Sequence, residues 1–349
     1  MKILTQNQTK VNRRGFSLIE LLVAMGILSV LMLMMTVLLD QVQRSWRFSE
    51  SRISQFREAR VAFDLMAKNI GQATLNTYWD LKDEDKDGLY DGYFRTSELH
   101  FITVDGASLP GGPTQRPLGH AVFFQAPLGF STNYRNLNNL FNGRGYFVSF
   151  GDDSDFIPSF AREKTTRRNR FRMMEFRPPA ESNQVFQDGM DERATSSPQI
   201  FDQWFRQGLG VGDGNFTDHL NPLAENILTL IISPRDTLSN AGDSRGETYS
   251  LIAPGYSYDS NDPSEDFEAF SQQVPPLIRL TVIAIDEETA ARFDSGASLP
   301  PELDLSSYFQ RTENFDADLK EISEAFGDSN INYKVFSTVV MLRSSKWST

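Results

Sequence analysis

The sequence predicts an α+β protein: one long N-terminal helix, membrane-spanning and then amphipathic, packed on an antiparallel β-sheet with long loops. Three features predict it: an uncharged apolar run over 21–39, a helical apolar stripe after it, and seven later segments rich in β-branched and aromatic residues. The expected segments are a basic leader over 1–15, a transmembrane helix over 16–39, a helical stalk over 40–75 and an extracytoplasmic globular domain over 76–349.

The first apolar segment is long enough to cross a bilayer. From Phe16 to Leu39 it carries a single charge, Glu20, and a helix needs about 20 apolar residues to span the hydrocarbon core. Four basic residues precede the segment: Lys2, Lys10, Arg13 and Arg14. The positive-inside rule therefore places the N-terminus in the cytoplasm and the rest of the chain across the membrane.

The residues around this junction carry a motif. Arg13-Arg14-Gly15-Phe16-Ser17-Leu18-Ile19-Glu20-Leu21-Leu22-Val23-Ala24-Met25 closely resembles the leader of type IV pilins and type II secretion pseudopilins. The resemblance implies that prepilin peptidase cuts between Gly15 and Phe16 and that the new N-terminus, Phe16, is methylated. It also implies that Glu20 pairs with the Phe16 amino group of a neighbouring subunit during filament assembly. The competing interpretation is a plain signal anchor whose Glu20 reaches the membrane surface.

The helix is expected to continue beyond the membrane as an amphipathic stalk. Its apolar stripe consists of Val42, Trp46, Ile53, Phe56, Phe63, Met66 and Ile70. Arginines occupy much of the remaining surface, at Arg44, Arg47, Arg52, Arg57 and Arg60, and they form either a solvated face or a surface for acidic neighbours. Residues 56–73 resemble the stalk of J-type minor pseudopilins and of the pilus protein W.

Seven segments are predicted as strands, with antiparallel pairing expected: 99–104, 121–125, 146–150, 171–177, 227–232, 277–285 and 335–342. One short amphipathic helix is expected from Phe315 to Phe326, closed by Gly327. The segments 276–282 and 335–340 resemble the last strands of J-type pseudopilins. No part of 105–270 resembles that family.

An acidic run follows the stalk and has the pattern of half a calcium loop. Asp83, Asp85, Asp87 and Asp91 stand at loop positions 1, 3, 5 and 9, with Gly88 at position 6 and the Leu89 carbonyl at position 7. Phe94 stands at position 12, where a bidentate Glu is expected, so Glu98 or Asp80 would have to complete the shell. The alternatives are a structural Ca²⁺ site and a solvated acidic turn.

A basic run lies in the middle of the chain and consists of Arg162, Lys164, Arg167, Arg168, Arg170 and Arg172. It predicts either a docking patch for DNA or an acidic partner, or a solvated loop that leads into an edge strand. The whole chain has a net charge of −12, and removal of the leader with its four basic residues takes this to −16. Nucleic acid is therefore not an expected partner.

The composition argues against an enzyme. The chain has no cysteine and three histidines, and its Ser, His and Asp residues form no nucleophile motif. Ca²⁺ is the one cofactor that the sequence suggests.

The resemblance implies a minor pilin or pseudopilin of a periplasmic filament for type II protein secretion. Its implied partners are prepilin peptidase and other pilins, and its implied location is the inner membrane, with a single pass. The alternatives are a minor pilin of a type IV pilus or DNA-uptake system and, from another class, a membrane-anchored binding protein or hydrolase.

Overall fold

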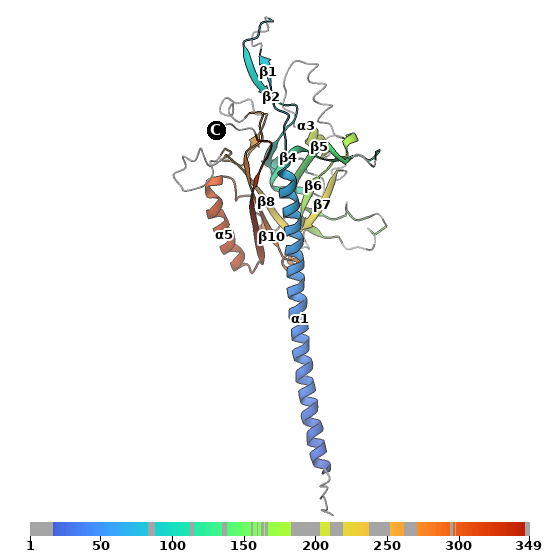
Figure 1. The fold of residues 1–349 in the computed structure, drawn as a ribbon. Helices are drawn as coiled ribbons and strands as arrows, with labels where there is room; N and C mark the ends of the chain where they lie inside the picture. Colours follow the sequence, from blue (N-terminus) through green and yellow to red (C-terminus); the bar gives the residue numbers. More distant parts are fainter. Residues whose placement is uncertain are drawn as a thin grey trace, which may run out of the picture. The chain divides into compact units, whose positions relative to one another are not determined.

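The structure, a computed structural model, forms two compact units, Met1–Ile53 and Ser54–Thr349 (Figure 1). It describes residues 17–82, 88–111, 115–134, 138–154, 156–158, 160–161, 164, 167–182, 203–209, 219–236, 252–261, 271–293, 296 and 298–345. At positions 44, 47–55, 82, 138, 139, 203, 207 and 208 it describes the backbone alone.

Helix α1 runs from Leu18 to Ile70 and begins in the first unit. Among the described residues, its part Leu18–Gln43 is the one helical segment long and apolar enough to span a membrane. Its 26 residues extend about 39 Å at a rise of about 1.5 Å per residue, against a hydrocarbon core of about 30 Å. The large apolar side chains from Leu18 to Leu39 are all exposed, which in water would be unfavourable and in lipid is not.

From Ser54 the helix belongs to the second unit, where its apolar stripe is buried. Phe63, Met66 and Ile70 lie in the core together with Ala59 and Ala62, and Phe56 packs against them. The predicted stripe is confirmed at these positions. Val42 and Trp46, in the first unit, are exposed.

The larger sheet of the second unit has six antiparallel strands. Their spatial order is β7-β6-β5-β4-β3-β9. Their bounds are β3 Ile102–Asp105, β4 Gln115–Phe130, β5 Asn138–Asp152, β6 Asn169–Phe176, β7 Leu220–Glu225 and β9 Tyr258–Asp259. The strands from β3 to β7 pair in sequence order, so most of this sheet is a meander. One face packs against α1, where Asn69 Nδ2 donates to the Tyr146 hydroxyl at 2.7 Å.

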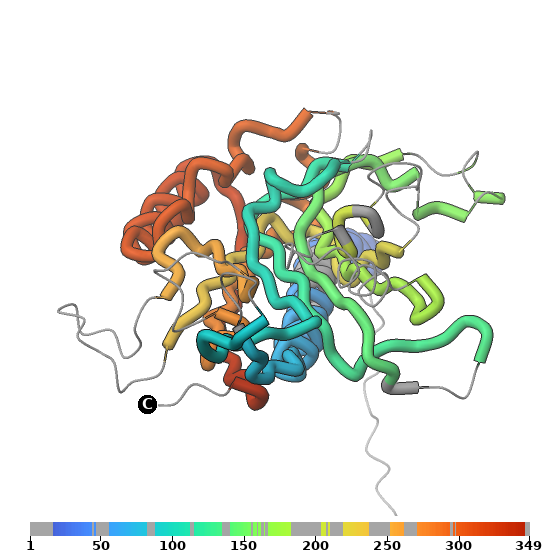
Figure 2. The backbone as a smooth tube through the Cα atoms, turned by 90° about the horizontal axis from the view of Figure 1, so that it is seen from above, coloured from blue at the N-terminus to red at the C-terminus, as the bar shows by residue number. Residues whose placement is uncertain are grey.

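The smaller sheet has three antiparallel strands in the order β11-β10-β8 and lies between two helices (Figure 2). Its strands are β8 Ile227–Arg235, β10 Leu277–Ile285 and β11 Tyr333–Met341. On one face the Phe336 ring lies 6.1 Å from the Phe63 ring of α1. On the other face, helix α5 (Phe315–Asp328) buries Ile322 and Phe326 against Ile283. The sheet therefore separates two hydrophobic cores.

A separate two-stranded hairpin, β1 (Tyr78–Lys82) and β2 (Gly92–Thr96), follows α1 and extends at one end of the second unit (Figure 1). The shorter helices are α3 Gln203–Gly208, α4 Glu287–Arg292 and the 3-10 turns Gly106–Ser108, Ala180–Ser182, Pro301–Leu303 and Thr312–Asn314.

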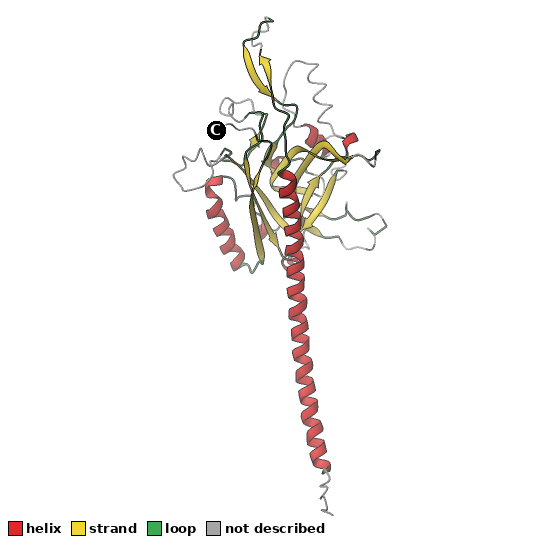
Figure 3. Ribbon diagram, viewed as in Figure 1, coloured by secondary structure: helices red, strands yellow, loops and turns green. Residues whose placement is uncertain are grey.

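The α+β prediction is confirmed, and each of the seven predicted segments contains strand (Figure 3). The prediction for 277–285 matches β10 in both bounds. The predicted end of α5 at Gly327 was wrong. The helix continues to Asp328, and the chain turns at Asn330, whose φ is 51°. Four strands, β1, β2, β7 and β9, were not predicted. β7 contains Pro222 and polar residues, and β9 has two residues, so neither carries a strand pattern.

Candidate functional site

The expected cleavage site lies outside the described residues, which begin at Ser17. This applies to Gly15, Phe16 and the basic leader over 1–15. The first described contact in this region joins Ser17 and Glu20. The Ser17 backbone N–H donates to Glu20 Oε2 at 3.3 Å, and the Glu20 N–H donates to Ser17 Oγ at 3.2 Å.

This reciprocal pair is a capping box, in which the first and fourth residues of a Ser-x-x-Glu sequence satisfy each other's backbone donors. It explains why α1 begins at Leu18. A carboxylate in the first turn also interacts favourably with the positive end of the helix dipole. Glu20, which the sequence predicts as an assembly residue, is thus engaged with its own helix terminus when the chain is alone.

The apolar helix leaves few polar groups facing its surroundings. The Ser29 hydroxyl donates to the Met25 carbonyl and the Thr36 hydroxyl to the Met32 carbonyl, both at 2.8 Å. Because hydroxyls are satisfied within the helix, they add little cost to its burial in lipid. Between Leu21 and Leu39 the helix has no ionisable side chain, so Glu20 is the single charge near its start.

Two of the five stalk arginines have side chains that the structure describes. Arg57 and Arg60 are exposed, and Arg60 lies 3.8 Å from Asp64 in an exposed i,i+4 pair. Exposed pairs of this kind contribute about 0.5 kcal/mol or less. The side chains of Arg44, Arg47 and Arg52 lie outside the description.

The basic run divides between buried and exposed side chains, and two of its six positions are too buried to belong to a docking patch. Arg170 and Arg172 are each 2% exposed and lie on β6, a strand between β5 and β7 rather than at a sheet edge. Lys164 and Arg167 are exposed, and Arg168 is partly exposed. Arg162 lies outside the described residues. Residues two apart on a strand share a face, so Arg170 and Arg172 point into the same network.

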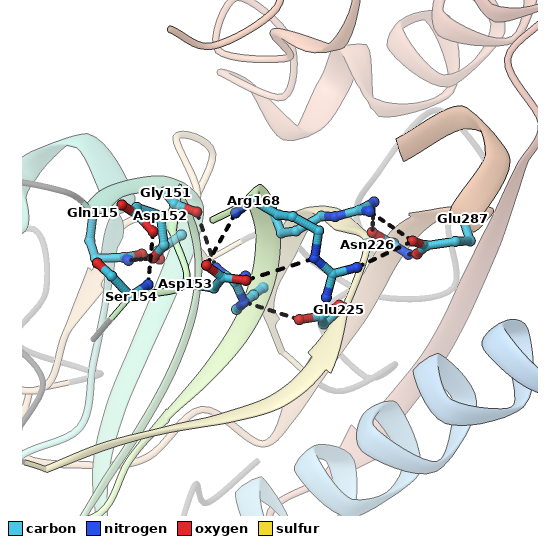
Figure 4. Close-up of polar contacts among 12 residues, drawn as sticks. Gln115, Gly151, Asp152, Asp153, Ser154, Arg168, Glu225, Asn226 and Glu287 are labelled. Carbon is cyan, nitrogen blue, oxygen red and sulfur yellow. Dashed lines mark hydrogen bonds and ion pairs between the residues drawn. The ribbon is translucent and has the colours of Figure 1, made fainter. Parts of the chain in front are cut away.

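Acidic side chains surround these arginines (Figure 4). Arg170 Nη2 donates to Glu287 Oε1 at 2.7 Å, and Arg172 Nε donates to Glu225 Oε1 at 3.3 Å. Arg168 lies 3.8 Å from Asp153 and 3.7 Å from Glu287.

The network also has a neutral member and a backbone acceptor. Asn226, between β7 and β8, donates to Glu287 Oε2 at 2.9 Å, and Arg172 Nη1 donates to the Gly151 carbonyl at 3.1 Å. Three arginines thus face three carboxylates. A balanced cluster offers little attraction to phosphate, so its evident role is to join β6 to the start of α4 and to the β7–β8 turn.

The predicted calcium loop lies at the tip of the β1–β2 hairpin. Asp83, Asp85 and Asp87 lie outside the described residues; Leu89 is exposed, Asp91 is described, and Gly88 has a φ of 87°. Lys82 pairs with Gly92, so the nine residues 83–91 connect the two strands. Among the described residues no group of three or more His, Cys, Asp or Glu is placed to hold a metal.

Glu98 is engaged with residues at the base of the hairpin. It accepts hydrogen bonds from the Tyr78 hydroxyl, at 2.8 Å, and from Asn76. Tyr78 pairs with Thr96 at the opposite end of the hairpin from the loop. The two ends are the first and last of five strand residues, about 13 Å apart at about 3.3 Å per residue. Asp80 is nearer to the loop, and its Oδ1 accepts from the Leu81 N–H at 2.8 Å.

Two of the three histidines are buried with both ring nitrogens engaged. His100 Nε2 lies 2.6 Å from Asp259 Oδ1, and its Nδ1 accepts from Trp204 Nε1 at 3.4 Å. His120 Nε2 lies 3.1 Å from the Phe309 carbonyl, and its Nδ1 accepts from the Ile232 N–H at 3.1 Å. A cavity of about 510 Å³ borders His120. Because both ring nitrogens of His120 are already hydrogen-bonded, neither is available to a substrate in that cavity. Both histidines therefore act as structural connectors.

Comparison with known proteins gives one match. Residues 10–36 match the family model of the prokaryotic N-terminal methylation motif. No curated protein and no solved structure matches the chain. The motif implies a type IV pilin-like precursor that is processed by prepilin peptidase, and it covers the end of the leader from residue 10 to Gly15, Phe16 and most of the apolar helix Leu18–Gln43.

Proposed function

We propose that this chain is a minor pilin or pseudopilin, a structural subunit of a periplasmic pilus-like filament that serves type II protein secretion. The observation that carries the proposal is the methylation motif over 10–36 continuous with an apolar helix whose one charge before Asp40 is Glu20. In such a filament the exposed apolar surface of Leu18–Gln43 is covered first by lipid and then by the helices of neighbouring subunits.

Glu20 is the proposed assembly residue. A carboxylate in apolar surroundings is costly unless a cation meets it. In the single chain it caps its own helix through Ser17, and in the filament it would meet the methylated Phe16 amino group of a neighbour. Because the bond from the Ser17 N–H to the Glu20 carboxylate is exposed and 3.3 Å long, exchanging it for an ion pair with an amino group is favourable.

The second unit is the proposed periplasmic domain, and prepilin peptidase and other pilins are the proposed partners. A domain of nearly 300 residues is difficult to repeat along a closely packed filament, which favours a low-copy position at its tip or start. The burial of Arg170 and Arg172 beside carboxylates makes the basic run less suited to DNA docking. A minor pilin of a type IV pilus or DNA-uptake system is the alternative within the class.

The test begins with the N-terminal mass of the membrane-extracted chain, produced with and without prepilin peptidase. We expect a chain that starts at methylated Phe16 when the peptidase is present and an uncut chain when it is absent. A chain that stays uncut with active peptidase would leave only a membrane-anchored protein.

Two variants then separate capping from charge. Glu20→Gln keeps a side chain suited to the capping box and loses the charge, so we expect normal cleavage and exclusion from sheared filaments. Ser17→Ala loses the cap and keeps the charge, so we expect incorporation close to that of the unmodified chain. Equal incorporation of the Glu20→Gln variant would contradict the assembly role of Glu20.

A further inference from the structure

Strand β11 is a long sheet edge that the described part of the chain leaves without the usual protection. Sheets commonly blunt their edges with short strands, proline, charge or a covering element. β9 has two residues, and β7 contains Pro222. The free side of β8 is covered by the β4 bulge, where His120 accepts from the Ile232 N–H. β11 has nine residues and one charge, Lys334, and it pairs with β10 alone among the described strands.

The backbone groups that face outward from β11 can be identified. Two hydrogen bonds continue the β10–β11 ladder beyond the ends of β11, from Leu342 N–H to the Pro276 carbonyl and from Asp286 N–H to the Asn332 carbonyl. In an antiparallel pair, hydrogen-bonded positions alternate with positions whose N–H and C=O point away. Even-numbered residues of β11 therefore bond to β10. The outward positions are Tyr333, Val335, Ser337, Val339 and Met341.

No described residue takes up these five outward N–H and C=O pairs. Their spacing, one donor and one acceptor at every second residue, matches the edge of another extended backbone. Val339 and Met341 are also 43% and 69% exposed at this edge. An extended segment beside β11 would satisfy the backbone groups and cover the two apolar side chains.

The charge of the chain segment that contains the strand indicates which kind of segment fits beside it. From Ile331 to Trp347 the chain has no acidic residue and three basic ones, Lys334, Arg343 and Lys346, although the chain as a whole has a net charge of −12. The Lys334 and Arg343 side chains are exposed. These exposed basic residues of the strand segment disfavour a second copy of β11 and favour an acidic strand.

We propose that β11 is a strand-addition site that binds an extended segment of a neighbouring subunit, with apolar residues alternating with carboxylates. The identification of the partner as a filament subunit rests on the proposed function. The identification of the edge as a strand-addition site rests on its backbone groups and charge alone. The added strand would extend the three-stranded sheet to four and fix the second unit against its neighbour.

The first test is hydrogen exchange at single-residue resolution on the full chain in detergent micelles. The amides of residues 335, 337, 339 and 341 should exchange at least tenfold faster than those of 336, 338 and 340. Equal protection at both sets would mean that the edge is already covered and would overturn the proposal.

The second test measures binding of a nine-residue peptide in which valine alternates with glutamate, by fluorescence anisotropy. The matched probe replaces glutamate with lysine. We expect the glutamate peptide to bind at least tenfold more tightly and to slow exchange at the outward amides. Equal affinity for both peptides, or no binding, would contradict the proposal.

Two variants at one position test the backbone directly. Ser337→Pro removes an outward N–H and no bond to β10, a position where edge strands accept proline, and should weaken peptide binding at least tenfold. Ser337→Ala loses the side-chain contact with Thr281 and keeps the N–H, so its binding should stay within twofold. Unchanged binding by a folded Ser337→Pro chain would overturn the proposal. The N-terminal mass of the same samples reports processing separately, so failure of the edge and failure of the proposed function are distinguishable.

Discussion

The backbone N–H of Ile232 donates to Nδ1 of His120 across the junction of the two sheets, at 3.1 Å. His120 stands on the β4 bulge, and its other ring nitrogen contacts the Phe309 carbonyl. Because Nδ1 accepts, the imidazole must be neutral for this contact to exist. The junction of the sheets is therefore sensitive to protonation.

Acid should weaken the second unit through His120. Burial lowers the pKa of His120 to about 4, against the smaller opposing effects of the Phe309 carbonyl and Asp105. The unfolded state, with an ordinary pKa of 6.5, then binds more protons between these values, so this stabilisation is complete above pH 6.5 and is lost as the pH falls toward 4. The loss amounts to up to about 3 kcal/mol over the whole interval and to about 2 kcal/mol between pH 7.5 and 5, measurable by urea unfolding at these two pH values. His120→Gln should remove most of this slope while His219→Gln keeps it; an unchanged slope in His120→Gln would assign it to other groups.

A buried ion pair lies where α1 meets the larger sheet. Arg144 Nη1 donates to Glu175 Oε1 at 2.8 Å, and the same oxygen accepts from the Tyr146 hydroxyl at 2.7 Å. Burial raises the pKa of Tyr146, so it stays a donor. Glu175→Ala should destabilise the chain by about 3 to 5 kcal/mol, because it leaves the Arg144 charge buried and without its carboxylate.

The comparison that isolates this charge is the Arg144→Met, Glu175→Met double variant. Apolar replacement of both partners removes the buried charge as well as the pair, so its loss in urea unfolding should be smaller than that of Glu175→Ala. A double variant that is the less stable of the two would show that the pair itself stabilises the fold.

Gly119 is needed at the β4 bulge. Its φ is 62°, and a Cβ there would lie 2.3 Å from Thr229 Oγ1 and 2.9 Å from the Leu230 carbonyl oxygen. Gly119→Ala should cost about 2 to 4 kcal/mol in urea unfolding, from backbone strain and overpacking. Gly327→Ala is the control, since it lies in α5 with no atom near the added Cβ and should gain about 0.5 to 1 kcal/mol. Similar effects of the two substitutions would mean that the bulge adapts.

Calcium binding at the hairpin loop remains a prediction of the sequence. An isolated two-stranded hairpin is marginally stable, so an ion at its tip would stabilise it. We expect Ca²⁺ to raise the melting temperature relative to chelator and Asp85→Asn to remove that rise, with Asp328→Asn on α5 as control. A melting temperature that does not respond to Ca²⁺ in the unmodified chain would favour the solvated acidic turn.

Local patterns were enough to predict several parts of this protein. The leader motif and the apolar helix are defined by residues that are neighbours in the chain. Strands such as 277–285 have a continuous apolar pattern because they are buried on both faces. The stripe of α1 was readable for the same reason, because its 3.6-residue period records one buried face.

Other features depend on contacts between residues far apart in the chain. A run of six basic residues looks like a surface patch until the fold brings Glu225 and Glu287 beside Arg172 and Arg170, since an ion pair across more than 50 positions has no local signal. The partners of His120 and the free edge of β11 likewise follow from strand order. Local sequence thus decided where α1 and the strands with apolar patterns lie, whereas tertiary packing decided the short or polar strands such as β7 and β9, which charges are neutralised inside and which backbone groups stay open to a partner.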